Sequence, residues 1–321
     1  MSSMTNVSTA LPKKEKATKY KDMNQLSTGA NLLWHILLIF GCLCVIVPLW
    51  IVIVASFTDN ATLVMHGYKF WPKVFSASAY EFLLSSGGGS MLLAYKNTLI
   101  ATLVGTVLCV ISVGLYAYPL SRTDFRFRRF FTFYSFFSMV FNIGTVAFYM
   151  LCTSILQINN TLYALFLPQS FSAYWVIIMR TFYKSNIPDS VIESARIDGA
   201  GEWRTLLQIV APLAVPGFAT VALFAAVGIW NNYFNVLLLI NKRELYNLQY
   251  TLAEILKSIQ FLKEMASSSG GSVDTIKNLG DLPSESFRMA MAVVTMGPIV
   301  LAYPFFQKYF VKGLTIGAVK G

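Results

Sequence analysis

Charged residues are scarce in this sequence, and its long apolar segments contain neither aspartate nor glutamate. Charged residues make up 12% of the 321 residues and hydrophobic residues 55%, whereas a soluble chain carries about 25% charged residues. This deficit excludes an ordinary water-soluble domain. Cysteine is also rare, and no histidine or carboxylate accompanies it, so we expect small core residues and no metal site. The four cysteines are Cys42, Cys44, Cys109 and Cys152.

Motifs for catalysis and nucleotide binding are missing as well. The glycines at 87–89 precede Ser90 but lack the Gly-Lys-Ser/Thr ending of a phosphate-binding loop, so we expect a flexible connector there. The apolar segments hold no paired carboxylates, metal-ligand set or Ser–Lys pair, which argues against a membrane-embedded enzyme. Their lack of acidic residues also removes the usual ion site of a secondary transporter. We therefore expect neither catalysis nor a bound cofactor in this chain.

Six segments are long and apolar enough to cross a bilayer, which takes about 20 residues per helix. No strand-length alternation with turn punctuation is present. The sequence therefore predicts an all-α polytopic membrane protein with six transmembrane helices. A tail at 1–29 would precede a transmembrane domain at 30–321, in which loops at 188–212 and 241–285 join predicted spans. The predicted spans are about 32–57, 98–120, 130–155, 161–182, 213–240 and 289–311.

Basic residues are concentrated on one side of these predicted spans. An even number of spans puts both termini on the same side, and that side carries most of the 25 Lys and Arg residues. The positive-inside rule then places both termini and the loop at 188–212 in the cytoplasm. This distribution explains the net charge of +10 without a nucleic-acid partner. The basic aromatic stretch Arg126–Tyr134 fits an anchor at the membrane interface.

The segment between the fourth and fifth predicted spans contains two helical pieces around a glycine. Ser190–Glu193 fits the capping box of a helix start, and Gly199 permits a turn that other residues resist. The second piece, Trp203–Val210, carries its apolar side chains on one side and ends or kinks at Pro212. Such a helix–turn–helix would be a stiff protrusion. Glu193 could serve as a helix cap or pair with a basic residue of a partner.

This segment resembles the cytoplasmic EAA loop of permease subunits in ATP-binding-cassette (ABC) importers. Its pattern is Glu-Ser-Ala, three residues, Gly, nine residues, Ile, one residue, Ala-Pro. The family pattern has Glu-Ala-Ala at the start and Leu-Pro at the end, so a serine and an alanine depart from it. In that family the loop grips the ATPase, and the resemblance implies an ATPase-coupling role here. The matching or adjacent positions are Glu193, Ser194, Ala195, Asp198, Gly199, Ile209 and Pro212.

The resemblance covers nearly the whole chain and is strongest to the maltose-permease G kind, in the group serving complex sugars in Gram-positive bacteria. The second span opens with Asn97-Thr98-Leu99 and closes with the AYPLSR sequence of residues 117–122, where Pro119 is a departure. The WNNYF sequence at 230–234 resembles the family's Trp-Asn-Glu-Phe, with an amide in place of the acid. The end of the chain, Gly313–Gly321, resembles the family's terminal tail.

The resemblance implies a complex in a bacterial cell membrane. This chain and a second, different permease would form the path for an oligosaccharide or related sugar. Two ATPase subunits holding ATP and Mg would dock on the coupling loops, and an extracellular or periplasmic binding protein would deliver the sugar. The loop at 241–285 would reach that protein, although the apolar stripe Leu248–Leu262 equally fits a surface helix resting on the bundle. A non-sugar solute is the alternative substrate.

Several amides lie in otherwise apolar spans, where an unpaired amide costs several kcal/mol. They should face the bundle or a wet cavity. Amides and flat aromatic faces meet sugar hydroxyls, so these residues are candidates for the substrate path; the alternative is hydrogen bonding between helices. The candidates are Asn142, Tyr149, Trp230, Asn231, Asn232, Tyr233 and Asn235.

Overall fold

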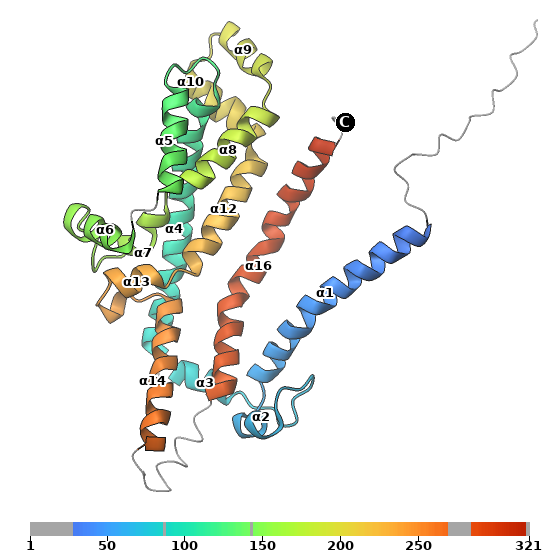
Figure 1. The fold of residues 1–321 in the computed structure, drawn as a ribbon, viewed down its shortest axis with the longest axis vertical. Coiled ribbons are helices and arrows are strands. Elements are labelled where there is room, and N and C mark those ends of the chain that lie inside the picture. The colour runs from blue at the N-terminus through green and yellow to red at the C-terminus, as the bar shows by residue number, and fades with distance from the viewer. Residues whose placement is uncertain (1–27, 86–87, 142–143, 269–283, 319–321) are drawn as a thin grey trace, which may run out of the picture. The chain divides into compact units, whose positions relative to one another are not determined.

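The structure, a computed structural model, describes residues 28–85, 88–141, 144–268 and 284–318 (Figure 1). Within these ranges the chain is helical and has no β-strand beyond an isolated bridge between Thr58 and Phe75. This confirms the predicted all-α class. Three of the described helices are long and apolar enough to cross a membrane, or up to five if each of two bent pairs is one span. The chain divides into two compact units, residues 1–50 and 51–321.

The first long helix, α1 (Thr28–Ser56), is apolar around its whole circumference. It has 29 residues and no Lys, Arg, Asp or Glu, which is the composition of a membrane-spanning helix. The predicted span at 32–57 falls on it. Cys42 and Cys44 are exposed on this helix, so the expectation of core cysteines is wrong for them, whereas Cys109 and Cys152 are buried.

The central helix of the second unit is α4 (Gly88–Ser121), which has 34 residues. It begins well before residue 98, and Gly88 and Gly89 form its first turn, which corrects the expected flexible connector for these two residues. Glycine is also what lets α4 approach its neighbours. A Cβ at Gly114 would lie 2.6 Å from the Phe218 ring, and one at Gly105 would lie 2.7 Å from Ile229. Small residues at such positions permit close helix packing in membranes.

The third, fourth and fifth predicted spans are each divided into shorter helices. Asn232 starts a new helix after the fifth is interrupted, because its side-chain oxygen accepts the Asn235 amide at 3.1 Å. Broken helices occur at membrane depth where protein or a wet cavity covers the released backbone groups. The pieces are α5 (Arg128–Val140), α6 (Gly144–Met150), a π-helical turn (Leu151–Ile155), α7 (Tyr163–Phe166), a 3-10 turn (Leu167–Gln169), α8 (Ala173–Asn186), α12 (Val215–Trp230) and α13 (Phe234–Leu239).

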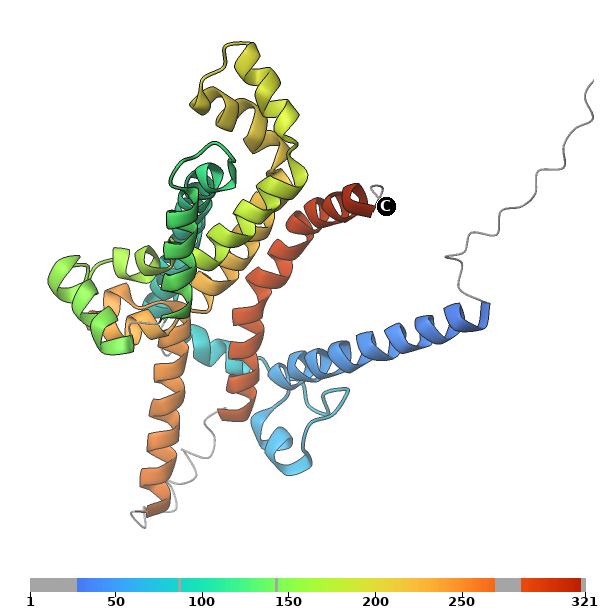
Figure 2. The same cartoon turned by 45° about the horizontal axis from the view of Figure 1, so that its top comes forward.

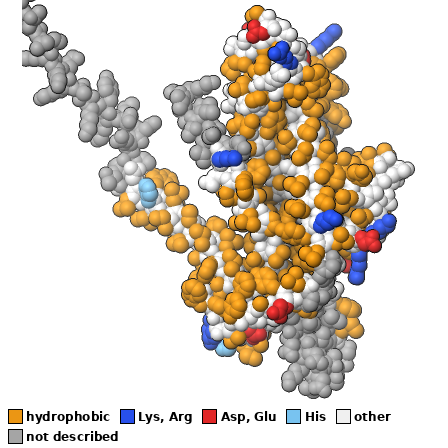
Figure 3. Space-filling model, turned by 180° about the vertical axis from the view of Figure 1, so that it is seen from behind, with side chains coloured by type: hydrophobic (Ala, Val, Ile, Leu, Met, Phe, Trp, Pro, Cys, Tyr) orange, Lys and Arg blue, Asp and Glu red, His pale blue; other side chains and the backbone are white. Residues whose placement is uncertain are grey.

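These helices form a bundle around α4 (Figure 2). The α4 helix packs against α12 and α8, and α5 packs against α8. The last helix, α16 (Ser284–Ala318), packs against α12 and α14 (Leu248–Ser268). Hydrophobic side chains cover most of the face shown in Figure 3. Buried residues at the centre include Cys109, Val113, Ala117, Val176, Met179 and Val221.

The α14 helix rests on its own chain. Leu248, Leu252 and Ile259 from the predicted apolar stripe are buried in a cluster with Phe287 and Met291. Two short helices, α2 (Asn60–His66) and α3 (Ser78–Ser85), precede α4, and α3 supplies two residues of the same cluster, Ala79 and Leu83. This packing supports the interpretation of a surface helix resting on the bundle.

Two of the motifs that resemble the family meet at the start of α14. The Asn97 side chain donates to the carbonyls of Glu244 at 2.8 Å and Tyr246 at 3.1 Å. The Thr98 hydroxyl accepts the Leu248 amide at 2.8 Å, and the Asn247 side chain donates to the Asn232 carbonyl. We refer to Asn97, Thr98, Asn232 and Asn247 as the polar junction. It ties the start of α14 to α4 and to the break between α12 and α13.

Candidate coupling site

The loop between α8 and α12 folds as short helices joined by a tight turn. Its first helix, α9 (Asp189–Ile197), is followed by its cap residue Asp198 and then by Gly199, whose φ is +76°. The Ala200 amide donates to the Ala195 carbonyl at 2.9 Å, and the Gly199 amide donates to the Arg196 carbonyl at 3.0 Å. This pair of bonds is the Schellman closure of a helix. The glycine of the sequence pattern is therefore set by the backbone of the turn, since a side chain at such a φ costs about 1–2 kcal/mol.

The start of α9 differs from the prediction. The helix begins at Asp189, with Pro188 at the cap position and no side-chain cap bond. Glu193 therefore lies in mid-helix, is exposed and does not close a capping box with Ser190. An acidic residue in the first turn offsets the helix dipole, so Asp189 favours this earlier start. The cap interpretation of Glu193 is wrong, and its contact with a partner stays a prediction.

The second half of the loop runs continuously through α10 (Glu202–Arg204), a π-helical turn (Thr205–Val210) and α11 (Ala211–Leu213). The prediction of one apolar side is wrong here. Leu206 and Val210 are buried against the bundle, whereas Trp203 and Leu207 are exposed. The wide turn changes the residue spacing per turn, and this separates the two sets. Pro212 lies inside α11, and the axis turns by 78° only beyond it, between Leu213 and Val215.

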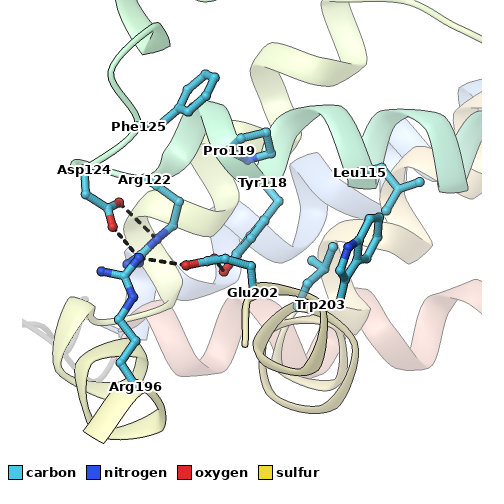
Figure 4. A pocket seen from close by; sticks show the side chains of 10 residues that line it. Leu115, Tyr118, Pro119, Arg122, Asp124, Phe125, Arg196, Glu202 and Trp203 are labelled. Atoms are coloured by element: carbon cyan, nitrogen blue, oxygen red, sulfur yellow. Dashed lines mark hydrogen bonds and ion pairs between the residues drawn. The ribbon is translucent and has the colours of Figure 1, made fainter. Parts of the chain in front are cut away.

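A network of ion pairs and hydrogen bonds joins this loop to the end of α4 (Figure 4). We call this network the clamp; its residues are Tyr118, Arg122, Asp124, Asp189, Arg196 and Glu202. The Arg196 guanidinium on α9 binds the carboxylates of Asp124 and Glu202, the latter at 2.7 Å. Glu202 also accepts the Tyr118 hydroxyl at 2.8 Å. Tyr118 belongs to α4, Asp124 to the segment after it, and Glu202 to α10. One cation therefore joins both halves of the loop to the central helix of the bundle.

A second arginine extends this network from the bundle side. Arg122 is nearly buried and lies 3.6 Å from Asp124 and 3.5 Å from Asp189 on α9. Burial alone would raise the pKa of the Asp124 carboxyl, but hydrogen bonds from Arg196 and the backbone, together with the charge of Arg122, hold that pKa below its usual value. The hydrogen bonds from Arg196 to Glu202 and Asp124 raise the pKa of its guanidinium further. Asp124 and Arg196 therefore both stay charged at neutral pH.

Beside the network lies a cavity of about 480 Å³, lined by both charged and apolar side chains (Figure 4). Leu115 and Pro119 of α4, Phe125 and Leu206 form its apolar part, and Trp203 stands at its edge with 68% of its surface exposed. Two further apolar residues of the loop face outward, Ile197 at 86% and Leu207 at 61% exposure. Large apolar side chains that are exposed on a loop outside a predicted span are available for contact with a partner protein.

The predicted coupling residues divide between an inner and an outer side. Ala195 is buried against the bundle and Ile209 is half-buried. The others are exposed, namely Glu193, Ser194, Asp198, Gly199 and Pro212. The structure thus brings them together on one loop, where the exposed ones can reach a partner.

The candidate path residues do not form one group. Asn231, Asn232, Tyr233 and Asn235 lie at the break between α12 and α13. Asn231 and Tyr233 are exposed, whereas Asn232 and Asn235 are buried with no hydrogen-bond partner for their amide nitrogens among the described residues.

The other candidates lie elsewhere in the fold. Trp230 is 3% exposed and donates its indole N–H to the Thr295 carbonyl at 3.0 Å, which is a contact between α12 and α16. Tyr149 is exposed on a different element, α6. Asn142 lies outside the described residues.

Sequence reasoning missed the network residues Tyr118, Arg122, Asp124, Arg196 and Glu202. Tyr118 and Arg122 belong to the AYPLSR motif of residues 117–122, but the sequence assigns them no function. In the described part of the chain, no group of three or more His, Cys, Asp or Glu residues could hold a metal ion. The arrangement offers charge pairing and an apolar surface, and these are features of docking.

Helices that are long and apolar enough to cross a membrane, together with a loop that exposes large apolar side chains, define the class of α-helical membrane proteins. The comparisons identify the family. The chain belongs to the family described as the binding-protein-dependent transport system inner membrane component, whose pattern matches residues 110–316. Its members are permease subunits, so this chain is a transport component and not an enzyme.

Relatives and a solved structure support this assignment. The chain is 33% identical over 293 residues to the polygalacturonan/rhamnogalacturonan transport system permease protein YtcP of Bacillus subtilis, covering 90% of this chain and 97% of that one. It is 28% identical to the arabinooligosaccharides transport system permease protein AraQ of Halalkalibacterium halodurans, covering 85% and 91%. The fold is similar to a chain in the crystal structure of a bacterial ABC transporter involved in the import of the acidic polysaccharide alginate. That match has a TM-score of 0.71 and 28% identity, and covers 89% of this chain and 99% of that one.

Proposed function

We infer that this chain forms half of the translocation path of an ATP-driven importer for an oligosaccharide, and that the loop at 188–212 is where its ATPase docks. The observation that carries the docking role is the exposed apolar surface of that loop. Ile197, Trp203 and Leu207 are 86%, 68% and 61% exposed. A partner that covers them removes this apolar area from water, at about 25 cal/mol for each Å².

The clamp gives this docking a mechanical consequence. The ion pairs Arg196–Asp124 and Arg122–Asp189 join the loop to the end of α4. The buried Ile192, Leu206 and Val210 pack it into the main core. A short helix held at so many points bends little. When ATP binding closes the partner ATPases, movement of the loop would therefore pass to α4 and open the translocation path to the outside of the membrane.

The proposed assembly follows from the family. A second, different permease would complete the path, two ATPase subunits would hold ATP and Mg, and an extracellular or periplasmic binding protein would deliver the solute to a bacterial cell membrane. Relatives named for polygalacturonan/rhamnogalacturonan and for arabinooligosaccharides support a sugar oligomer as the solute. This chain would bind no cofactor of its own.

The proposed topology has six spans, with both termini and the docking loop in the cytoplasm. The basic residues near the loop, including Arg122, Arg196 and Arg204, support this orientation. The pieces α7 and α8 would together make the fourth span, although they are interrupted at Leu167–Gln169.

The docking role is tested by charging the exposed apolar surface. Leu207→Glu should lower the amount of ATPase that co-purifies with the permease at least about fivefold, which corresponds to 1 kcal/mol at an interface. Leu84→Glu is the matched control, because Leu84 on α3 is 63% exposed and lies in another part of the bundle. Equal co-purification with both variants would contradict docking at this loop.

A further inference from the structure

The basic aromatic stretch that follows α4 forms part of a second hollow, distinct from the one beside the coupling loop. It has a volume of about 400 Å³ and lies between α5 and α8. Three arginines line it, Arg128 and Arg129 from α5 and Arg180 from α8, and its described lining contains no carboxylate. Three cations around one small space repel one another unless an anion lies among them.

Two of these arginines are held in place by backbone oxygens at the end of α4. The Arg180 Nε donates to the Leu120 carbonyl at 3.0 Å, and an Arg128 Nη donates to the Arg122 carbonyl at 3.3 Å. A guanidinium has five N–H donors, so each retains several for a ligand. Their forked donors match the oxygens of phosphate.

The rest of the hollow is apolar. Phe133 and Phe136 on α5 are 65% and 52% exposed, and Ile177 on α8 lies beside them. Thr132 also lines the hollow, and its hydroxyl is buried without a hydrogen-bond partner among the described residues. A ligand that fits both parts has an anionic head and a hydrocarbon tail.

We propose that this hollow binds an anionic phospholipid, with the phosphate among Arg128, Arg129 and Arg180 and an acyl chain along Phe133 and Phe136. The hollow lies at the end of the bundle that carries the coupling loop, and its placement at the cytoplasmic leaflet rests on the proposed function. Basic pockets between membrane helices on that side hold anionic head groups. The phosphate offsets part of the repulsion among the three arginines and joins α5 to α8 beside the clamp.

The test counts retained lipid on the complete transporter. The complex is purified from membranes containing equal amounts of phosphatidylglycerol and phosphatidylcholine, and bound lipids are counted by native mass spectrometry. Arg129→Gln is the main variant, because Arg129 is exposed at its edge and its loss leaves both backbone-anchored arginines in place. Wild type should retain phosphatidylglycerol in preference, and Arg129→Gln should lower that preference about fivefold. Arg129→Lys should restore part of it. Lys257→Gln, at an exposed position of α14, should leave it unchanged.

Three outcomes would overturn the proposal. Wild type that retains both lipids equally has no anionic-lipid site, for example because the second permease covers the hollow. Equal retention by Arg129→Gln and Lys257→Gln would place the lipid elsewhere. Loss of sugar uptake in Arg129→Gln with lipid retention intact would assign the arginines to an acidic solute. ATPase co-purification is measured on the same samples, and its failure in wild type would count against the docking loop and not against the lipid site.

Discussion

At the scale of the residue, two glycines of one loop have opposite tolerance for a side chain. Gly199 has a φ of +76°, whereas Gly201 has a φ of −72° and caps α10. Neither has an atom within 4 Å of an added Cβ, so only the backbone angle separates them. Gly199→Ser should therefore destabilise the turn by about 1–2 kcal/mol and weaken ATPase co-purification.

The matched control is Gly201→Ser, which places a good capping residue at a compatible angle. It should leave co-purification and thermal stability near wild type. Equal effects of the two serines would mean that the loop adapts to the left-handed position and that the Schellman closure is unimportant for docking.

Also at residue scale, the Asp124 carboxyl predicts a pH dependence. Its pKa lies below the ordinary value of about 3.9, so its ion pairs stabilise the folded loop above that pH. The contribution is lost as the pH falls through the lower, folded pKa. Because the side chain is 41% exposed, the effect should be at most about 1 kcal/mol.

The comparison is between wild type and Asp124→Asn in thermal unfolding of the purified protein, from about pH 5 to pH 2. Wild type should lose more stability over this range, because the amide has no charge to lose. Parallel curves would show that these ion pairs add nothing to the folded state.

At the scale of the element, the clamp between α4 and α10 can be measured directly. The bond from Tyr118 to Glu202 is 2.8 Å long and its donor is nearly buried. A double-mutant cycle with Tyr118→Phe and Glu202→Ala, each of which removes this bond, should give a coupling free energy of about 1 kcal/mol in thermal stability. Both single variants should also raise ATP hydrolysis that is not accompanied by uptake. Strictly additive effects would remove this bond from the clamp.

At the break between α12 and α13, the neighbouring residues Asn231 and Asn232 are expected to affect assembly and uptake differently. Asn232→Leu removes the side chain that starts α13 and should cost about 1 kcal/mol, so assembly and uptake should fall together. Asn231 is exposed, and its side chain bonds to the Val227 carbonyl of its own helix at 3.0 Å. Asn231→Leu should preserve assembly, and loss of uptake alone would place Asn231 on the substrate path. If Asn232→Leu instead assembled normally but lost uptake, Asn232 would be assigned to the substrate path.

The sequence predicts the elements better than their interruptions. The apolar segments and the stripe on α14 follow from composition and periodicity, and Gly199 follows from the family pattern. The asparagines at 231, 232 and 235 mark polar positions in the fifth predicted span. Their presence does not by itself distinguish one straight helix from the two pieces α12 and α13. The break depends on hydrogen bonds of Asn232 that only the folded chain supplies.

The clamp cannot be predicted from the sequence for a related reason. Arg196 and Asp124 are 72 positions apart, and a charge in a loop gives no sign of its distant partner. The exposed side of the coupling loop was also mispredicted, because the π-helical turn at Thr205–Val210 shifts which residues face the bundle. Sequence reasoning therefore singles out the loop at 188–212 as a candidate site, but it predicts neither the ion pairs of this loop nor which of its residues are exposed.

At the scale of the whole second unit, α4 connects two otherwise separate polar sets. Asn97 and Thr98 of the polar junction lie near one end, and Tyr118 lies near the other, about 30 Å away at 1.5 Å per residue. That length equals the hydrocarbon thickness of a bilayer. If the coupling loop docks the ATPase as proposed, a displacement applied to α14 would reach that loop with little loss, because an uninterrupted helix transmits movement along its axis as a rigid rod.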